Sequence, residues 1–191
     1  MLIDDVSLIR KEDLLGKIIA FSTDTVFGVG AIISDTRAID KIYRLKNRDY
    51  SKPLAILAAT IDDILPYVKD VSEEVLNIMY NYWPGALTII FKKSQLVDKI
   101  ITNGLDTIAF RIPNSKNALE VLKKFGPLAT TSVNISGQVP LNNYEEIAQV
   151  FGTQIDYIVG KNENSSNISS TIIDATNEKI KIIREGEVKV K

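Results

Sequence analysis

Short apolar runs alternate along the chain with longer stretches in which apolar residues recur every three or four positions. Runs of the first kind are typical of buried strands, and stretches of the second kind are typical of helices with one buried face. The predicted strands cover residues 18–21, 54–57, 87–91, 107–110, 128–131, 155–159, 171–173 and 180–183. Because helices alternate with these strands, we predict a single α/β domain over residues 1–191, built on a twisted mixed sheet.

Four predicted helices follow residues that commonly cap helices. Asp35, Ser72, Ser115 and Asn143 each carry a side-chain oxygen that can accept a hydrogen bond from the first backbone N–H groups of a helix. The apolar residues of the four helices, in chain order, are Ala38, Ile39, Ile42, Tyr43 and Leu45; Val75, Leu76, Ile78, Met79 and Tyr82; Ala118, Leu119, Leu122 and Phe125; and Ile147, Val150 and Phe151. A proline or a glycine follows each helix and predicts its end.

Two polar segments lie outside these elements. Residues 161–170 are rich in Asn and Ser, and we predict a mobile loop there. Residues 23–30 follow the first long apolar strand, and Gly28 and Gly30 would let this backbone approach a small polar ligand closely. A plain turn is the alternative. The glycine spacing matches neither a Walker loop nor a dinucleotide fingerprint.

Composition narrows the possible functions. The 191 residues are 45% hydrophobic and 25% charged, with 23 basic and 24 acidic residues and a net charge of -1. Such a balance argues against a global attraction to nucleic acid or membranes but allows a local basic pocket. No apolar run reaches the ~18 residues of a membrane-spanning helix. The first residues lack the basic start and apolar core of a signal peptide, so we expect a cytoplasmic protein without a membrane contact.

The chain contains no histidine and no cysteine. Their absence removes the usual general base, the usual soft metal ligands and the thiol nucleophile. Cations, hydroxyls and amides remain. These groups suit the binding and orientation of anions better than proton transfer.

Three cations gather near the predicted end of the first helix. Lys46 and Arg48 are separated by one residue, and Lys52 follows shortly after them. They could converge on a polyphosphate, because Arg offers a planar fork and Lys a compact charge. The alternative is structural, since the helix dipole favours cations at the C-terminus of any helix.

Arg111 stands at the end of the predicted strand 107–110, and strand ends are where α/β sheets commonly bind ligands. It could clamp a carboxylate there, and an ion pair at the rim of the sheet is the alternative. Because side chains alternate along a strand, Thr107, Ala109 and Arg111 should share one face.

Similar polar residues flank the later strands. Ser132 and Asn134 follow the strand 128–131 and would share a face if the extended conformation continues. Ser170 and Arg184 lie next to the last two predicted strands. Each has a structural alternative when taken singly, because Ser and Asn in turns usually satisfy their own backbone.

Taken together, these motifs resemble the YrdC-like family of threonylcarbamoyl-AMP synthases over nearly the whole chain. The family pattern runs T-D-T-V-Y-G-L-G, K-x-R, W-P-G-x-L-T, R-x-P, S-x-N-x-S-G, S-T-I and R-x-G. The similar segments here are residues 23–30, 46–48, 83–88, 111–113, 132–137, 170–172 and 184–186. Each motif is short, but their common order and spacing make the resemblance specific.

The chain departs from the family pattern at a few positions. Ser22 replaces a proline, Phe27 a tyrosine and Val133 an alanine, and Asn142 stands where a hydroxyl residue is common. These changes bear on fine contacts with the substrates. Because the chain ends soon after residues 184–186, it resembles the short form of the family, which lacks an extra C-terminal domain.

The resemblance implies a YrdC-like fold with a concave, positively charged cavity. It also implies that L-threonine, bicarbonate or CO2, and ATP react to give threonylcarbamoyl-AMP and pyrophosphate. A downstream threonylcarbamoyl-transferase complex then modifies the adenosine at position 37 of tRNAs. The reactants are anionic, so the protein must offset charge repulsion and align the attack. Mg2+ would be held mainly by the phosphates of ATP and by water rather than by a set of protein ligands.

The resemblance further implies roles for individual residues. The implied threonine contacts are Thr25, Arg111, Ser132 and Ser170. The implied ATP contacts are Arg48, Lys52, Thr107, Asn134, Asn142 and Arg184. Lys46 and Arg48 would supply charge and orientation, and no general acid or base is assigned.

Two rival functions make different demands on the sequence. A non-enzymatic RNA-binding module could use the same basic concavity, but the aromatic content of 7% and the balanced charge leave room only for weak RNA binding. A carbamoyl-transfer domain of the hydrogenase-maturation type normally sits in a much longer chain with zinc-binding cysteines, and this chain has no cysteine.

Overall fold

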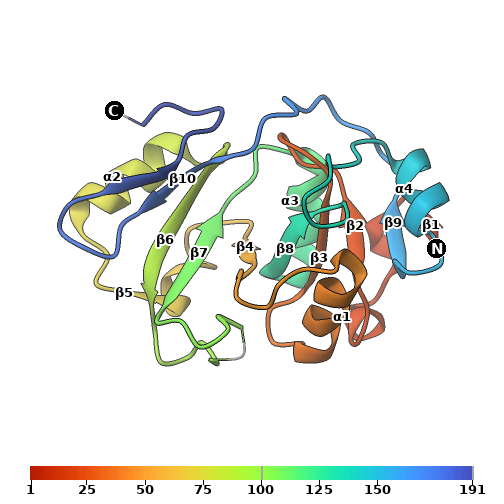
Figure 1. Ribbon diagram of the computed structural model, residues 1–191, viewed down its shortest axis with the longest axis horizontal. Helices are drawn as coiled ribbons and strands as arrows, with labels where there is room; N and C mark the ends of the chain where they lie inside the picture. The colour runs from red at the N-terminus through yellow and green to blue at the C-terminus, as the bar shows by residue number, and fades with distance from the viewer. Residues whose placement is uncertain (100, 191) are drawn as a thin grey trace.

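The computed structural model describes residues 1–99 and 101–190 of the protein. Its strands are β1 Leu2–Ile3, β2 Ile19–Phe21, β3 Gly28–Ile32, β4 Ala55–Leu57, β5 Val68–Lys69, β6 Leu87–Lys93, β7 Thr107–Arg111, β8 Leu128–Ser132, β9 Tyr157–Val159, β10 Thr171–Asp174 and β11 Lys181–Arg184. They form one sheet in the order β1-β9-β2-β3-β8-β4-β7-β6-β10-β11, with β5 paired to β6 beside this path. Parallel and antiparallel pairs both occur, which confirms the predicted mixed sheet. The two termini lie at opposite ends of the sheet (Figure 1).

The four predicted helices and their caps are confirmed. The helices are α1 Thr36–Lys46, α2 Glu73–Tyr82, α3 Lys116–Phe125 and α4 Tyr144–Phe151, and three short 3-10 helices cover Val6–Leu8, Lys11–Leu14 and Leu65–Tyr67. In each α-helix the side chain of the predicted cap accepts a hydrogen bond from a first-turn N–H group. Val150 of α4 is 55% exposed and does not belong to the buried side of this helix. Ile147 and Phe151 are the buried residues of α4, and Tyr144 and Ala148 pack partly buried against the same core.

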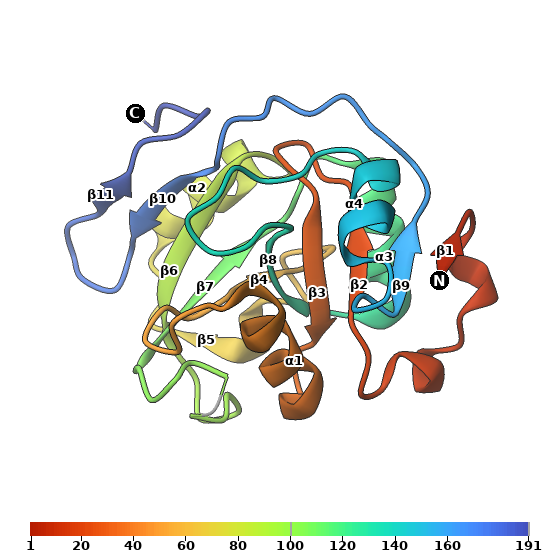
Figure 2. The same ribbon diagram turned by 45° about the vertical axis from the view of Figure 1, so that its right-hand side comes forward.

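The helices cover the two faces of the sheet unequally. Buried side chains of α1, α2 and α4 share one core with alternate strand residues such as Val29, Ala129 and Phe110. Side chains of α3 share a second, smaller core with strand residues such as Ile19 and Leu128, which point the other way. Figure 2 shows α3 and α4 on opposite sides of β2. Among the described residues, this second core includes Leu57 of β4 but no residue of β7, β6 or β10, so α3 leaves that part of the face open.

The sequence prediction missed β3 and the two short strands β1 and β5. Gly28 and Gly30 were expected in a turn, either one that approaches a ligand or a plain one, but they lie inside β3 and pair with β8. A Cβ atom on Gly28 would lie 2.8 Å from Cγ2 of Thr130, and one on Gly30 would lie 3.0 Å from Oγ1 of the same residue. The two glycines thus allow β3 to approach the side chain of Thr130 closely.

Residues 161–170 contain no helix or strand, as predicted. Hydrogen bonds nevertheless connect this loop to the rest of the protein. Glu163 accepts hydrogen bonds from Ser115 Oγ at 2.5 Å and from the backbone N–H of Asn117 at 2.8 Å, at the start of α3. The backbone N–H groups of Ser166 and Asn167 donate to the carbonyls of residues 24 and 25. Its mobility stays a prediction. Within the described residues no helix has the length and apolar character needed to cross a membrane.

Candidate functional site

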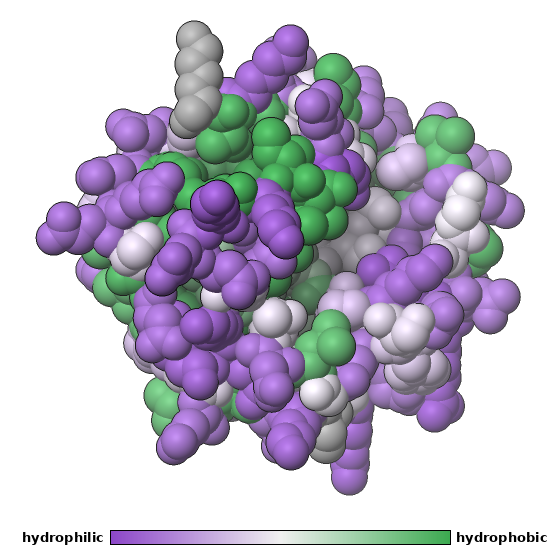
Figure 3. Space-filling view, turned by 60° about the vertical axis from the view of Figure 1, so that its left-hand side comes forward, coloured by the Kyte–Doolittle hydropathy of each residue, from purple (hydrophilic) through white to green (hydrophobic). Residues whose placement is uncertain are grey.

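A cavity of about 440 Å³ lies on the face of the sheet that α3 leaves open. Its polar lining consists mainly of hydroxyl side chains and three arginines. These residues are Thr23, Thr25, Thr88, Thr102, Thr107, Thr130, Thr131, Ser132, Ser169, Ser170, Arg48, Arg111 and Arg184. Figure 3 shows the molecular surface hollowed, with side chains of intermediate hydropathy in the hollow. The volume falls within the range of small-molecule sites, and the donors suit an anionic ligand.

Strand register brings these side chains to one face. Arg111 of β7 is the partner of Leu57 in β4, and Ile172 of β10 is paired both with Thr88 of β6 and with Arg184 of β11. Because side chains alternate, the residues of one such row point to the same side of the sheet. Thr107, Ala109 and Arg111 all line the cavity, which confirms that they share a face.

Arg111 is 6% exposed and forms part of the cavity wall. Its Nη2 donates to Asp24 Oδ1 at 2.6 Å, its Nη1 to Thr25 Oγ1 at 2.8 Å and its Nε to the carbonyl of Gly85 at 2.9 Å. Burial lowers the pKa of Arg111, and the charge of Asp24 opposes that shift. These three bonds use three of the five guanidinium N–H groups and leave one on each terminal nitrogen. Such a remaining pair can hold one carboxylate.

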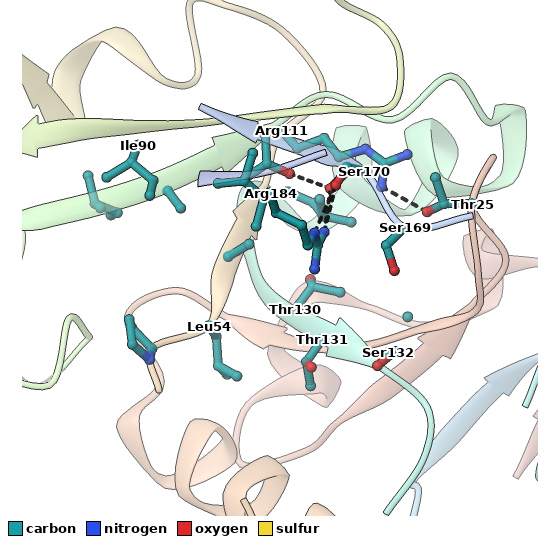
Figure 4. A pocket seen from close by; sticks show the side chains of 18 of the residues that line it. Thr25, Leu54, Ile90, Arg111, Thr130, Thr131, Ser132, Ser169, Ser170 and Arg184 are labelled. Carbon is teal, nitrogen blue, oxygen red and sulfur yellow. Dashed lines mark hydrogen bonds between the residues drawn. The ribbon is translucent and has the colours of Figure 1, made fainter. Parts of the chain in front are cut away.

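Arg184 reaches the same cavity from β11 (Figure 4). Its Nε and Nη2 donate to the carbonyl of Ser170 at 3.1 and 2.7 Å. The hydroxyl of Ser170 lies 2.8 Å from that of Thr88. Burial first, and the charge of Arg111 second, lower the pKa of Arg184. Two arginines that repel each other across one cavity make it a favourable place for an anion.

Arg48 lines the cavity from the loop between α1 and β4. Its Nε donates to the carbonyl of Lys52 at 2.9 Å, and its Nη2 donates to the carbonyl of Pro53 at 3.1 Å. Lys52 is exposed and contributes its carbonyl to this arrangement, while its side chain lies outside the cavity lining. The three N–H groups of Arg48 that these bonds do not use remain for a ligand.

Lys46 is only 2% exposed and lies behind the cavity rather than in its wall. Its Nζ donates to the carbonyl oxygens of Ser132 and Asn134 and, at 2.6 Å, to Oδ1 of Asn134. Burial lowers the pKa of Lys46 to about 8, and the neighbouring charge of Arg48 adds to this effect. The lysine therefore holds the turn after β8 in place.

Ser132 and Asn134 share a side of the chain, as predicted. Ser132 Oγ donates to Asn134 Oδ1 at 2.7 Å. The amide nitrogen of Asn134 donates to the carbonyls of Ile135 and Gln138 at 3.0 and 2.6 Å. Ser132 lines the cavity, whereas the amide of Asn134 is occupied within its own turn.

Asn142 also lies outside the cavity lining. Its Oδ1 accepts a hydrogen bond from the backbone N–H of Phe27 at 2.9 Å, and its Nδ2 donates to Ser165 and Asn167. It therefore fastens the start of β3 to the loop 161–170.

The structure divides the residues selected from the sequence into two groups. Those that line the cavity are Thr25, Arg48, Thr107, Arg111, Ser132, Ser170 and Arg184. Those that lie outside the lining are Lys46, Lys52, Asn134 and Asn142. Asp24, Thr88 and Thr130 were given no role. Strand alternation could have found Thr130 beside Ser132, but no local pattern reveals that Asp24 meets Arg111.

Among the described residues, those that line the cavity offer hydroxyl oxygens and no carboxylate. Within residues 1–99 and 101–190, no three Asp, Glu, His or Cys side chains are grouped so that they could hold a metal ion.

Comparison with known proteins places the chain among relatives of similar sequence. The family model Sua5_yciO_yrdC, described as "Telomere recombination", matches residues 14–186. The threonylcarbamoyl-AMP synthase of Pyrococcus abyssi is 35% identical over 172 residues, covering 90% of this chain and 51% of that protein. The threonylcarbamoyl-AMP synthase of Vibrio campbellii is 33% identical over 174 residues, covering 90% of this chain and 93% of that protein.

A solved structure shows the same fold. Pyrococcus abyssi Sua5 complexed with L-threonine matches with a TM-score of 0.86 and 31% identity, over 97% of this chain and 57% of that one. The chain thus spans little more than half the length of the matched Pyrococcus abyssi chains and nearly the whole length of the Vibrio relative.

Proposed function

This chain belongs to the Sua5, YciO and YrdC family, and we propose that it is a threonylcarbamoyl-AMP synthase. In this proposal L-threonine, bicarbonate or CO2, and ATP give threonylcarbamoyl-AMP and pyrophosphate. The observation that carries it is the meeting of Arg48, Arg111 and Arg184 around one hydroxyl-lined cavity. Relatives over 30% identical bear the name of this enzyme, and one solved relative is complexed with L-threonine.

The proposed threonine subsite is built around Arg111. Two of its N–H groups remain for the amino acid carboxylate, while Asp24 and Thr25 hold the guanidinium from behind. The hydroxyls of Ser132 and Ser170 lie in the same cavity and would contact the amine or the side-chain hydroxyl of threonine.

The proposed ATP subsite uses the other two arginines. Arg48, Thr107 and Arg184 line the cavity and would contact the nucleotide directly. Lys52 would add charge at the mouth. Lys46 and Asn134 would act from behind by fixing the turn that carries Ser132. Asn142, which the family pattern assigns to ATP, would act through the loop 161–170.

The chemistry needs alignment more than proton transfer. The amine of threonine adds CO2 and releases a proton, which gives a carbamate. A carbamate oxygen then attacks the α-phosphorus of ATP, and pyrophosphate leaves. Every partner in this attack is an anion, so arginines that neutralise the carboxylate and the phosphates lower the repulsion between them. Mg2+ would arrive with ATP, held by phosphate oxygens and water.

The proposed product is the substrate of a downstream enzyme. Threonylcarbamoyl-AMP is a mixed anhydride and would pass to a transferase complex that modifies adenosine 37 of tRNA. RNA binding by this chain itself would be weak at most.

Pyrophosphate release by the purified protein tests the proposed function. Release should require threonine, bicarbonate, ATP and Mg2+ together, and mass spectrometry should detect threonylcarbamoyl-AMP. Tight RNA binding without pyrophosphate release in the complete mixture would instead favour a non-enzymatic RNA-binding module.

A further inference from the structure

We infer that Tyr43 and Asn103 are positioning residues for Arg48, joined to it by a chain of hydrogen bonds through the backbone carbonyl of Lys52. The inference rests on the proposed function, in which Arg48 contacts ATP. It concerns two residues outside the family motifs, from α1 and from the loop between β6 and β7.

The chain of bonds is continuous. Asn103 Nδ2 donates to Tyr43 Oη at 2.6 Å, and Tyr43 Oη donates to the carbonyl of Lys52 at 3.1 Å. The same carbonyl accepts a bond from Arg48 Nε at 2.9 Å. The Tyr43 hydroxyl accepts one hydrogen bond and donates one, and the carbonyl of Lys52 accepts two. Both groups can form this number of hydrogen bonds.

Ring stacking and a second amide hydrogen bond support this series of hydrogen bonds. Tyr43 is 2% exposed, and its ring stacks on that of Tyr50 with centroids 4.6 Å apart. Asn103 also donates to the backbone carbonyl of Tyr50 at 2.5 Å. Asn103 itself adopts the left-handed backbone conformation, with φ 53.

The two connected loops border the same cavity. Arg48, Pro53 and Leu54 line it from one loop, and Thr102 and Leu105 line it from the other. The contacts of Asn103 therefore tie together two sides of the cavity mouth. Because Arg48 Nε is fixed through the carbonyl of Lys52, its unused N–H groups keep one direction, which lowers the entropy lost when phosphate binds.

Tyr43→Phe removes the link while it keeps the buried ring. Replacing Asn103 with glycine removes the amide and still allows the left-handed backbone. Each change should raise the Kd for ATP roughly threefold to tenfold, the range expected from one hydrogen bond, and leave the Kd for threonine unchanged. Calorimetric titration with ATP and with threonine measures both values.

Tyr157→Phe is the matched control. Its hydroxyl also accepts one hydrogen bond, from Lys17 Nζ at 3.0 Å, and donates one, to the carbonyl of Asp13 at 3.4 Å, but it lies far along the sheet from the cavity. This variant should bind ATP as the wild type does.

A double-mutant cycle between Tyr43→Phe and Arg48→Ala decides the matter. If Tyr43 acts through Arg48, it should have little further effect on ATP affinity once Arg48 is gone. Equal effects in both backgrounds, or equal losses of ATP and threonine affinity, would overturn the inference. If the wild type releases pyrophosphate, these contrary results would overturn the role of Tyr43 and Asn103 but not the proposed function. A wild type without pyrophosphate release would count against the function instead.

Discussion

Asp24 lies behind the cavity lining and forms an ion pair with Arg111, with Asp24 Oδ1 2.6 Å from Arg111 Nη2. Their side chains are 16% and 7% exposed. An ion pair this buried is costly to break, because the remaining charge keeps its desolvation penalty and loses its partner. The pair therefore fixes the guanidinium in one orientation beside the space where a ligand carboxylate would lie.

Arg111→Lys should weaken threonine binding, because lysine retains the charge without the planar fork. We expect the Kd for threonine to rise roughly 10- to 100-fold, as for a lost bond to a charged group, with a much smaller change for ATP. Calorimetric titration with both ligands checks this. Intact threonine affinity with reduced ATP affinity would place the carboxylate elsewhere.

Asp24→Asn should destabilise the protein, because asparagine keeps an acceptor for Arg111 but removes the opposing charge. We expect a loss of about 2 kcal/mol in the free energy of unfolding, measured by urea denaturation. Asp13→Asn is the control, since Asp13 pairs with an exposed arginine, Arg10, and should change stability little. Equal stabilities of the two variants would show that the buried pair contributes nothing.

Arg48→Ala should lower the rate of pyrophosphate release by ~10²–10³, the usual effect of losing one charged donor that acts on the transition state. The fold should persist, which circular dichroism can verify. A folded variant with the full rate would mean that Arg48 serves only to end α1.

Lys46 should make stability depend on pH in a defined window. Its pKa is lowered to about 8 in the folded protein from the ordinary lysine value of 10.5. Between these values the unfolded chain binds more protons than the folded one, so the free energy of unfolding should rise with pH through this window. Below pH 8 both states are charged, and the contribution is constant.

Urea denaturation between pH 7 and 10.5, compared with Lys46→Met, isolates the effect of this lysine. Methionine does not titrate, so the free energy of unfolding of the wild type should rise relative to that of Lys46→Met as pH rises above 8. A constant difference across the whole range would show that Lys46 keeps an ordinary pKa.

Asn142→Ala should loosen the loop 161–170, because Asn142 joins it to the start of β3. Amide hydrogen exchange should become faster around Ser165 and Asn167. ATP and threonine affinity should both fall modestly, since the loop leads into Ser170. A selective loss of ATP affinity with unchanged exchange would restore a direct nucleotide contact.

The sequence predicted the elements with strong side-chain periodicity and missed those without it. All four helices carried caps and an apolar face, and Arg111 was placed correctly because alternation along β7 is regular. β3 was missed because Gly28 and Gly30 leave no alternating pattern to read. The ion pair with Asp24 was missed because its partners are 87 residues apart.

The same limit applies to residues assigned by family resemblance. Asn134 and Asn142 occupy motif positions, yet their amides bond to the protein itself rather than face the cavity. A motif fixes the position of a residue along the chain, but the direction of its side chain depends on partners distant in sequence.

Gly28 and Thr130 both line the cavity, and the glycine leaves room for the threonine methyl. A methyl at position 28 would collide with Cγ2 of Thr130, so Gly28→Ala alone would force Thr130 to move. A serine at position 130 has no such atom and would accommodate the alanine. The two positions are therefore coupled through steric epistasis. An evolutionary path that changes residue 130 first stays open, whereas the reverse order passes through a distorted cavity.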